Sequence, residues 1–258
     1  MDTFWVNVGI QLLLMVVLWI VSVIRRDASV IDPWWPIGFL LISVNTALMA
    51  GLSAGKLVLL TMVGLWAIRL WLHLIIRSIG KPEDVRYTEF RKKYGPERYW
   101  WFSFFQVFLL QGTLVLIVSA PLQLASSAPD PDDVSAFDIA GAMLFVVGFV
   151  FEAVGDWQLT MFRRDPSKKG QVLDTGLWGL TRHPNYFGDS VIWWGFWLCT
   201  LDLGLAGFAT IFAPALMTFL LIRVSGVRML DEQLARTRAG YAEYMKRTPG
   251  FFPGIHWP

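Results

Sequence analysis

Long runs of apolar residues, separated by short polar segments, follow one another along the whole chain. A helix that crosses the hydrocarbon core of a bilayer needs roughly 17 to 25 predominantly apolar residues, and most of these runs reach that length. The pattern predicts an all-α, polytopic membrane protein that forms a single integral membrane domain over residues 1–258. The seven predicted transmembrane helices are 4–24, 31–51, 56–77, 102–122, 136–159, 187–201 and 204–223.

The basic residues predict how these helices are oriented. All lysines and arginines except Lys56 and Arg69 follow the first, third, fifth and seventh runs, whereas the connection 123–135 contains acids and no base. Cytoplasmic loops of membrane proteins are enriched in lysine and arginine. We therefore expect the N-terminus outside and the C-terminus in the cytoplasm.

Two segments on the basic side have patterns of their own. The loop 78–101 mixes charges with apolar residues and ends in Tyr99, Trp100 and Trp101, which is typical of a membrane interface. The tail 228–258 places apolar residues among charges, which predicts an amphipathic helix on the membrane surface that stops near Pro249.

The amino-acid composition also indicates a membrane protein. The chain is 55% hydrophobic and 16% charged, with a mean hydropathy of +0.50, whereas soluble domains carry about 25% charged residues. The net charge of +2 is too small to argue for nucleic acid as a partner. The single cysteine, Cys199, excludes an intrachain disulfide.

Polar and charged residues lie directly at the start of the sixth apolar run, in the segment 181–189, which reads Thr-Arg-His-Pro-Asn-Tyr-Phe-Gly-Asp. Asn185 and Asp189 are one helical turn apart at the start of the sixth apolar run. An Arg-His pair that anchors a helix at the headgroups would need neither of them. Polar groups at this depth mark a ligand or ion site by default, and we expect a functional site here.

A second polar set lies near the cytoplasmic end of the fifth helix. Glu152 and Asp156 are four residues apart and share one helix face, and Arg163 falls on the same face. Arg69 and His73 repeat this spacing on the third helix. A structural ion-pair network is one interpretation. The other is a site that opens to the cytosol and accepts a charged cofactor.

Common soluble catalytic signatures are missing from the sequence: it has no G-x-G-x-x-G fingerprint after a strand, no P-loop and no G-x-S-x-G elbow. Three histidines and one cysteine far apart make a zinc site improbable, and we predict no metal.

The residues from Asp156 and Arg163 through Gly176-Leu177-Trp178 to the segment 181–189 resemble the C-terminal half of the steroid 5α-reductase family. The similarity is greater to its bacterial branch of membrane proteins, the DUF1295 family. Ser225-Gly226-Val227, the ending 241–253 and the segment 80–87 fit the same pattern. The resemblance covers most of the chain beyond residue 65.

This resemblance implies a seven-helix enzyme of a bacterial inner membrane that holds NADPH in a cavity open to the cytosol. Its activity would be the reduction of a conjugated C=C bond in a lipophilic small molecule, with membrane lipids as surroundings. A steroid is not implied, because an isoprenoid or another lipid suits apolar walls equally well. The expected cofactor-binding residues are Glu152, Asp156, Arg163, Arg182, His183, Asn185, Tyr186, Asp189 and Arg223.

The chain departs from that family where the substrate carbonyl is polarised. The Gln-Glu pair of the family's second helix and the Tyr of its third are absent from 31–51 and 56–77. Reduction still needs a proton donor, and Tyr87, His73 and Asp32 are the candidate catalytic residues, in that order.

A rival interpretation is a methyltransferase that uses S-adenosylmethionine. Arg-His-Pro-x-Tyr also occurs in membrane enzymes similar to isoprenylcysteine carboxyl methyltransferases, which carry acids after the last helix, as this chain does at Asp231-Glu232. The Asp156 and Arg163 pair and the Asn185 to Asp189 turn favour the reductase. A non-enzymatic lipid-binding scaffold would leave the intramembrane charges unexplained.

Overall fold

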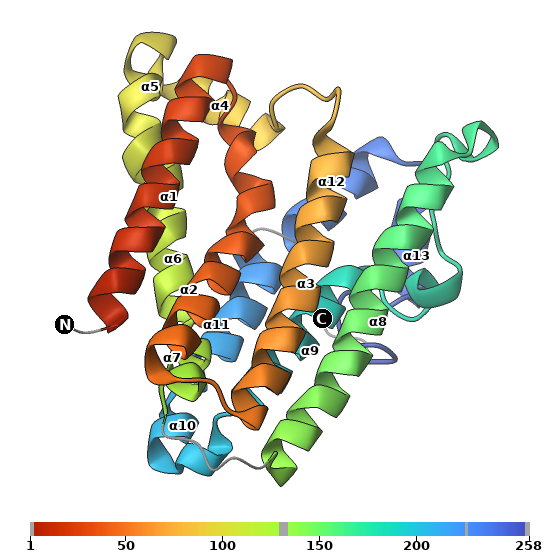
Figure 1. The fold of residues 1–258 in the computed structure, drawn as a ribbon. Helices are drawn as coiled ribbons and strands as arrows, with labels where there is room; N and C mark the ends of the chain where they lie inside the picture. The colour runs from red at the N-terminus through yellow and green to blue at the C-terminus, as the bar shows by residue number, and fades with distance from the viewer. Residues whose placement is uncertain (1–2, 129–133, 225–226, 256–258) are drawn as a thin grey trace. The chain divides into compact units, whose positions relative to one another are not determined.

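The computed structural model describes residues 3–128, 134–224 and 227–255. Throughout these residues the regular elements are helices (Figure 1), which confirms the all-α prediction. Contacts divide the chain into two compact units, Met1–Ser135 and Ala136–Pro258. Whether they form one domain stays a prediction, and each unit is described by itself.

In the first unit, α2 packs against α1, α3 and α7. The face of α1 that enters this packing is polar at one end, where Asn7 and Gln11 are buried, and apolar beyond them at Met15 and Leu18. The elements are α1 (Thr3–Arg25), the 3₁₀ helix η1 (Ala28–Trp34), α2 (Trp35–Ala50), α3 (Ala54–Ser78), α4 (Val85–Tyr94), α5 (Pro96–Ser103), the π-helical turn η2 (Phe104–Leu109), α6 (Leu110–Val118) and α7 (Ala120–Ser127).

In the second unit, α8 runs along α9, and α9 also packs against α11. The elements are α8 (Ala136–Arg164), the 3₁₀ helices η3 (Pro166–Lys168) and η4 (Gly176–Gly179), α9 (Pro184–Leu198), the 3₁₀ helix η5 (Leu201–Leu203), α10 (Leu205–Ala209), α11 (Phe212–Phe219), the π-helical turn η6 (Leu220–Val224), α12 (Val227–Thr237) and α13 (Tyr241–Arg247).

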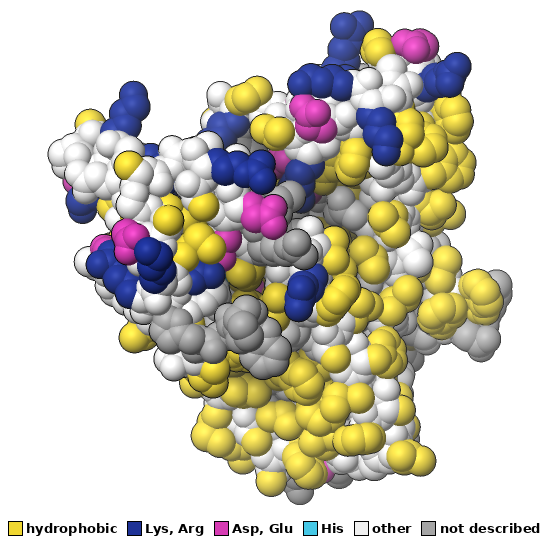
Figure 2. All heavy atoms as spheres, turned by 180° about the vertical axis from the view of Figure 1, so that it is seen from behind, with side chains coloured by type: hydrophobic (Ala, Val, Ile, Leu, Met, Phe, Trp, Pro, Cys, Tyr) yellow, Lys and Arg dark blue, Asp and Glu magenta, His cyan; other side chains and the backbone are white. Residues whose placement is uncertain are grey.

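Six helices among the described residues are long and apolar enough to cross a membrane, which indicates an integral membrane protein. They expose large apolar side chains such as Leu13 and Met143. Figure 2 shows hydrophobic side chains over broad areas of one face, while the lysine and arginine side chains gather in its upper part, with some hydrophobic side chains among them. The six spans are Thr3–Arg25, Ala28–Ala50, Ala54–Ser78, Pro96–Val118, Ala136–Arg164 and Leu205–Val224.

Three predicted helices have clearly different bounds in the structure. The fifth, predicted over 136–159, extends to Arg164 as α8. The fourth begins at Pro96, before the predicted residue 102, and it ends at Val118 because Pro121 cannot continue a helix and instead occupies the first turn of α7. The sixth, predicted over 187–201, is α9, which begins at Pro184 and has 15 residues. Asn185 and Asp189 therefore lie in the first turns of α9, whereas the predicted range 187–201 left Asn185 outside the helix.

Both basic-side segments contain helices. Within 78–101, α4 begins where the Asp84 side chain accepts a hydrogen bond from Arg86 N, and it ends at Gly95, whose φ of 78° favours glycine. The tail forms two helices, α12 and α13, where one amphipathic helix was predicted, because the chain turns at Gly240 in the left-handed conformation. Ser225 and Gly226 of the family pattern lie outside the described residues.

Candidate functional site

Glycines let α8 and α9 approach each other closely. A Cβ on Gly148 would lie 2.6 Å from Gly188 O, and one on Gly195 would lie 2.8 Å from Gly141 O. Neither contact leaves room for a methyl group. Small residues at such crossings allow helices in a membrane to pack backbone against backbone. The crossing places the polar residues of α8 directly beside the start of α9.

The predicted polar residues of the fifth and sixth helices meet at this crossing. Asn185 Nδ2 donates a hydrogen bond of 3.0 Å to Asp156 Oδ1, which joins the two helices. Glu152 and Asp156 on α8 and Asp189 on α9 are all buried. A buried carboxylate requires polar or cationic partners, so the crossing is a concentrated polar site inside an apolar pair of helices.

The predicted arginines divide into two groups. Arg163 lies in the last turn of α8 and Arg223 in η6, and both side chains are exposed. Arg182 lies between η4 and α9, and its guanidinium is engaged by the protein. It donates to Asp231 Oδ2 at 2.7 Å and to the carbonyls of Met245 and Thr248. The structure thus pairs Arg182 with Asp231 of the tail.

Asp231 on α12 is the centre of a buried cluster that sequence analysis did not assign. Besides Arg182, it accepts a hydrogen bond of 2.6 Å from the Tyr241 hydroxyl, and His183 Nε2 lies 3.0 Å from its Oδ1 atom. The His183 ring stacks on Tyr186 of α9, with ring centroids 5.6 Å apart. The cluster joins the tail helices to the segment that leads into α9.

Backbone contacts strengthen this junction between the tail and the residues before α9. Arg182 N donates to Pro249 O, and Thr181 Oγ1 donates to Phe251 O. The Tyr244 hydroxyl donates to Trp178 O. His183 and Arg182, predicted to bind cofactor, are thus held by the tail.

The acidity of Asp231 follows from these contacts. Burial alone would raise the pKa of its carboxyl, but the hydrogen bonds from His183 and Arg182 outweigh burial and lower the pKa to about 2. A lowered carboxyl pKa stabilises the fold fully above the ordinary value of 3.8, and this contribution is lost as the pH falls toward about 2. We expect no stability change from this group near neutral pH.

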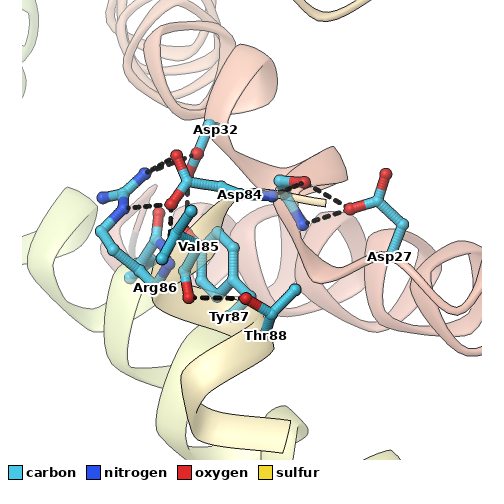
Figure 3. A network of polar contacts seen from close by, with 9 residues as sticks. Asp27, Asp32, Asp84, Val85, Arg86, Tyr87 and Thr88 are labelled. Atoms are coloured by element: carbon cyan, nitrogen blue, oxygen red, sulfur yellow. Dashed lines mark hydrogen bonds and ion pairs between the residues drawn. The ribbon is translucent and has the colours of Figure 1, made fainter. Parts of the chain in front are cut away.

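A separate network in the first unit contains two of the three candidate catalytic residues (Figure 3). The Tyr87 hydroxyl of α4 donates a hydrogen bond of 2.7 Å to Asp32 Oδ1 of η1, and Gln111 Nε2 donates to the Tyr87 hydroxyl at 3.2 Å. Arg86 Nη2 forms an ion pair of 2.9 Å with Asp32 Oδ2 and also contacts Asp84. His73, the third candidate, is partly buried on α3.

This geometry constrains how Tyr87 can act. Burial and the negative charge of Asp32 raise the pKa of Tyr87 well above its ordinary value of 10.0. The phenol therefore keeps its proton near neutral pH and directs it at Asp32. Such a group is fixed in place by its hydrogen bond to Asp32.

No group of three or more histidine, cysteine, aspartate or glutamate side chains arranged for a metal ion is present in the described part of the chain. The donor set of the α8 and α9 crossing, carboxylates with an amide, suits ribose hydroxyls and a carboxamide, and exposed arginines suit phosphates.

Several known proteins are similar to this chain in sequence. An uncharacterized protein of Schizosaccharomyces pombe is 24% identical over an alignment of 291 residues, which covers 99% of this chain and 82% of that protein. Two relatives match over shorter stretches. The Delta(14)-sterol reductase of Mus musculus is 30% identical over 122 residues, 42% of this chain and 28% of its own length. A probable O-methyltransferase of Ustilaginoidea virens is 32% identical over 73 residues, 28% of this chain and 26% of its own length.

One family profile spans both units of the chain. It describes the DUF1295 family, proteins of unknown function, and it matches residues 18–248. The match includes the α8 and α9 crossing, the Asp231 cluster and the Tyr87 network. With most of its length inside that match, this chain belongs to the DUF1295 family.

Proposed function

We propose that this protein is a membrane-embedded oxidoreductase that uses NADPH to reduce a conjugated C=C bond in a lipophilic substrate, such as a steroid, an isoprenoid or another unsaturated lipid. The observation that carries the proposal is the hydrogen bond from the half-buried Asn185 to the buried Asp156 at the α8 and α9 crossing. The similarity of part of the chain to a sterol reductase supports the same class of reaction.

The second unit contains the groups that would hold the cofactor. Glu152, Asp156 and Asp189 would accept hydrogen bonds from ribose hydroxyls, and Asn185 would bind the carboxamide. Arg163 and Arg223 would neutralise the phosphates, while Arg182, His183 and Tyr186 would fix the start of α9 that presents Asn185. When bound, NADPH supplies a hydride.

Replacing Asp156 by asparagine removes the charge and keeps the shape. A hydrogen bond to a charged group contributes about 1.5 to 3 kcal/mol, so NADPH affinity should fall by about 10- to 100-fold. Affinity is measured by intrinsic tryptophan fluorescence in mild detergent. Asp202→Asn, an exposed acid in η5, is the matched control and should bind like wild type. Unchanged affinity in Asp156→Asn would remove the cofactor assignment.

We propose Tyr87 as the proton donor of the reaction, with Asp32 positioning it and His73 as the alternative donor. Tyr87→Phe should lower the turnover number with an enone lipid by at least about 100-fold, the usual scale of general acid catalysis, and leave NADPH affinity intact. His73→Gln is the companion variant. A turnover loss in His73→Gln alone would transfer the role to His73.

A methyltransferase that uses S-adenosylmethionine is the second candidate, favoured by the similarity of part of the chain to a probable O-methyltransferase. Asp231 is one of the two acids that suggested a methyltransferase, and its carboxylate already contacts Arg182 and Tyr241. That contact weakens the case for Asp231 as a ligand of the methyl donor.

We also propose seven membrane crossings, with α9 as the short sixth, the N-terminus outside and the cofactor site open to the cytosol of a bacterial inner membrane. The distribution of lysine and arginine supports this orientation. A reporter fused to the C-terminus should be active on the cytoplasmic side, and activity outside would contradict the proposal.

A further inference from the structure

A cavity of about 360 Å³ lies at the end of α8 in the second unit, outside the site described above. The last turns of α8 form one wall, with Trp157, Met161 and Phe162, and the chain that folds back from η3 forms the other, with Lys168 and Thr175. At 100° per residue, Trp157 and Met161 lie about 100° to 180° around the helix from Glu152 and Asp156. The cavity therefore lies on another face of α8 than these two carboxylates.

The cavity is apolar on one side and charged on the other. Trp157 is 60% exposed and Met161 is 40% exposed, although both belong to the final turns of a helix apolar enough to span a membrane. Indole rings are enriched at this level of a bilayer. Lys168 Nζ lies 5.6 Å from the centre of the Phe162 ring, at the polar side.

The charge around the polar side is positive. Residues 164–169 contain three basic residues and one acid, Asp165, which also lines the cavity. The Asp165 carboxylate is already engaged, because its Oδ1 atom accepts hydrogen bonds from the backbone N and the hydroxyl of Ser167. Its other oxygen, Oδ2, forms an exposed ion pair of 3.6 Å with Lys168 Nζ, longer than the ~2.8 Å of a strong charge-assisted hydrogen bond. The Lys168 ammonium can therefore turn to an anion at the cavity.

We propose that this cavity binds an anionic phospholipid of the surrounding membrane. The phosphate lies at Lys168, within the field of Arg164 and Lys169, and an acyl chain lies along Trp157 and Met161. Juxtamembrane basic clusters attract anionic headgroups in this way. The proposal does not depend on the identity of the cofactor.

Lipid binding to the detergent-purified full chain tests this directly, by native mass spectrometry with phosphatidylglycerol and phosphatidylcholine of identical acyl chains. Phosphatidylglycerol should bind more tightly by about fivefold, the effect of one lysine near an anionic surface. Lys168→Gln should abolish this preference. Lys246→Gln is the matched control, because Lys246 also forms an i,i+3 ion pair, with Glu243, and it should keep the preference.

A second pair of variants tests the apolar wall. Trp157→Ala should weaken binding of both lipids, whereas Trp5→Ala, which removes an indole that is 59% exposed on α1, should not. Equal binding of the two lipids to wild type, or the same loss in both lysine variants, would overturn the proposal. So would full occupancy by glycerol phosphate without acyl chains, or displacement of the lipid by NADPH, which would assign the cavity to the nucleotide.

Discussion

Alanine at position 231 is expected to lower the free energy of unfolding by about 3 to 5 kcal/mol, the usual cost of removing one partner from a buried ion pair. Asp231 is 5% exposed and accepts hydrogen bonds from Arg182 and Tyr241. Without it, the Arg182 guanidinium loses its counter-ion inside the protein. The thermal unfolding midpoint in mild detergent should fall, and the segment before α9 should become more accessible to protease.

The control for Asp231 is Glu243→Ala. Glu243 pairs with Lys246 on the surface of α13, with both side chains 72% exposed, and such pairs contribute about 0 to 1 kcal/mol. Glu243→Ala should therefore unfold almost like wild type. If both variants unfold at the same temperature as wild type, the junction between the tail and α9 does not stabilise the second unit.

Gly188→Ala is expected to cost at least about 1 to 3 kcal/mol, the range for overpacking a well-packed interior. The added Cβ would lie 2.5 Å from Gly148 O and would also overlap the backbone N of Glu152. Since the obstacle is backbone, relief requires α8 and α9 to separate. We expect a lower unfolding midpoint together with weaker NADPH binding, because separation also breaks the hydrogen bond from Asn185 to Asp156.

Gly9→Ala separates this steric effect from the general effect of alanine in a helix. Apart from the adjacent residues and backbone of α1 itself, no atom lies within 4 Å of the position a Cβ would occupy at Gly9. Alanine there should stabilise the helix by about 0.5 to 1 kcal/mol. If Gly188→Ala behaves like Gly9→Ala, the close crossing of α8 and α9 is wrong.

The helices were largely predictable because the bilayer sets their length and composition. Errors arose where a local signal competed with hydropathy. Pro121 ends the fourth span earlier than the apolar run does, and Pro184 begins α9 before its apolar run starts. Both prolines are visible in the sequence, and a proline in the first turn is a common helix start.

The polar crossing was partly predictable and the Asp231 cluster was not. The spacing of four residues predicted that Glu152 and Asp156 share one helix face. No rule based on sequence spacing could pair Arg182 with an acid 49 residues later in the chain. That contact depends on how the tail folds back. A usable signal was overlooked on α8, where Gly141, Gly148 and Gly155 recur every seven residues and indicate a close helix partner.

The central claim is that the polar crossing of α8 and α9 binds NADPH. The most direct test is to purify the wild-type protein in mild detergent and titrate it with NADPH and, separately, with S-adenosylmethionine, following tryptophan fluorescence or thermal shift. Our account predicts saturable binding and stabilisation by NADPH, and none by S-adenosylmethionine. Binding of S-adenosylmethionine without binding of NADPH would contradict it and identify a methyltransferase.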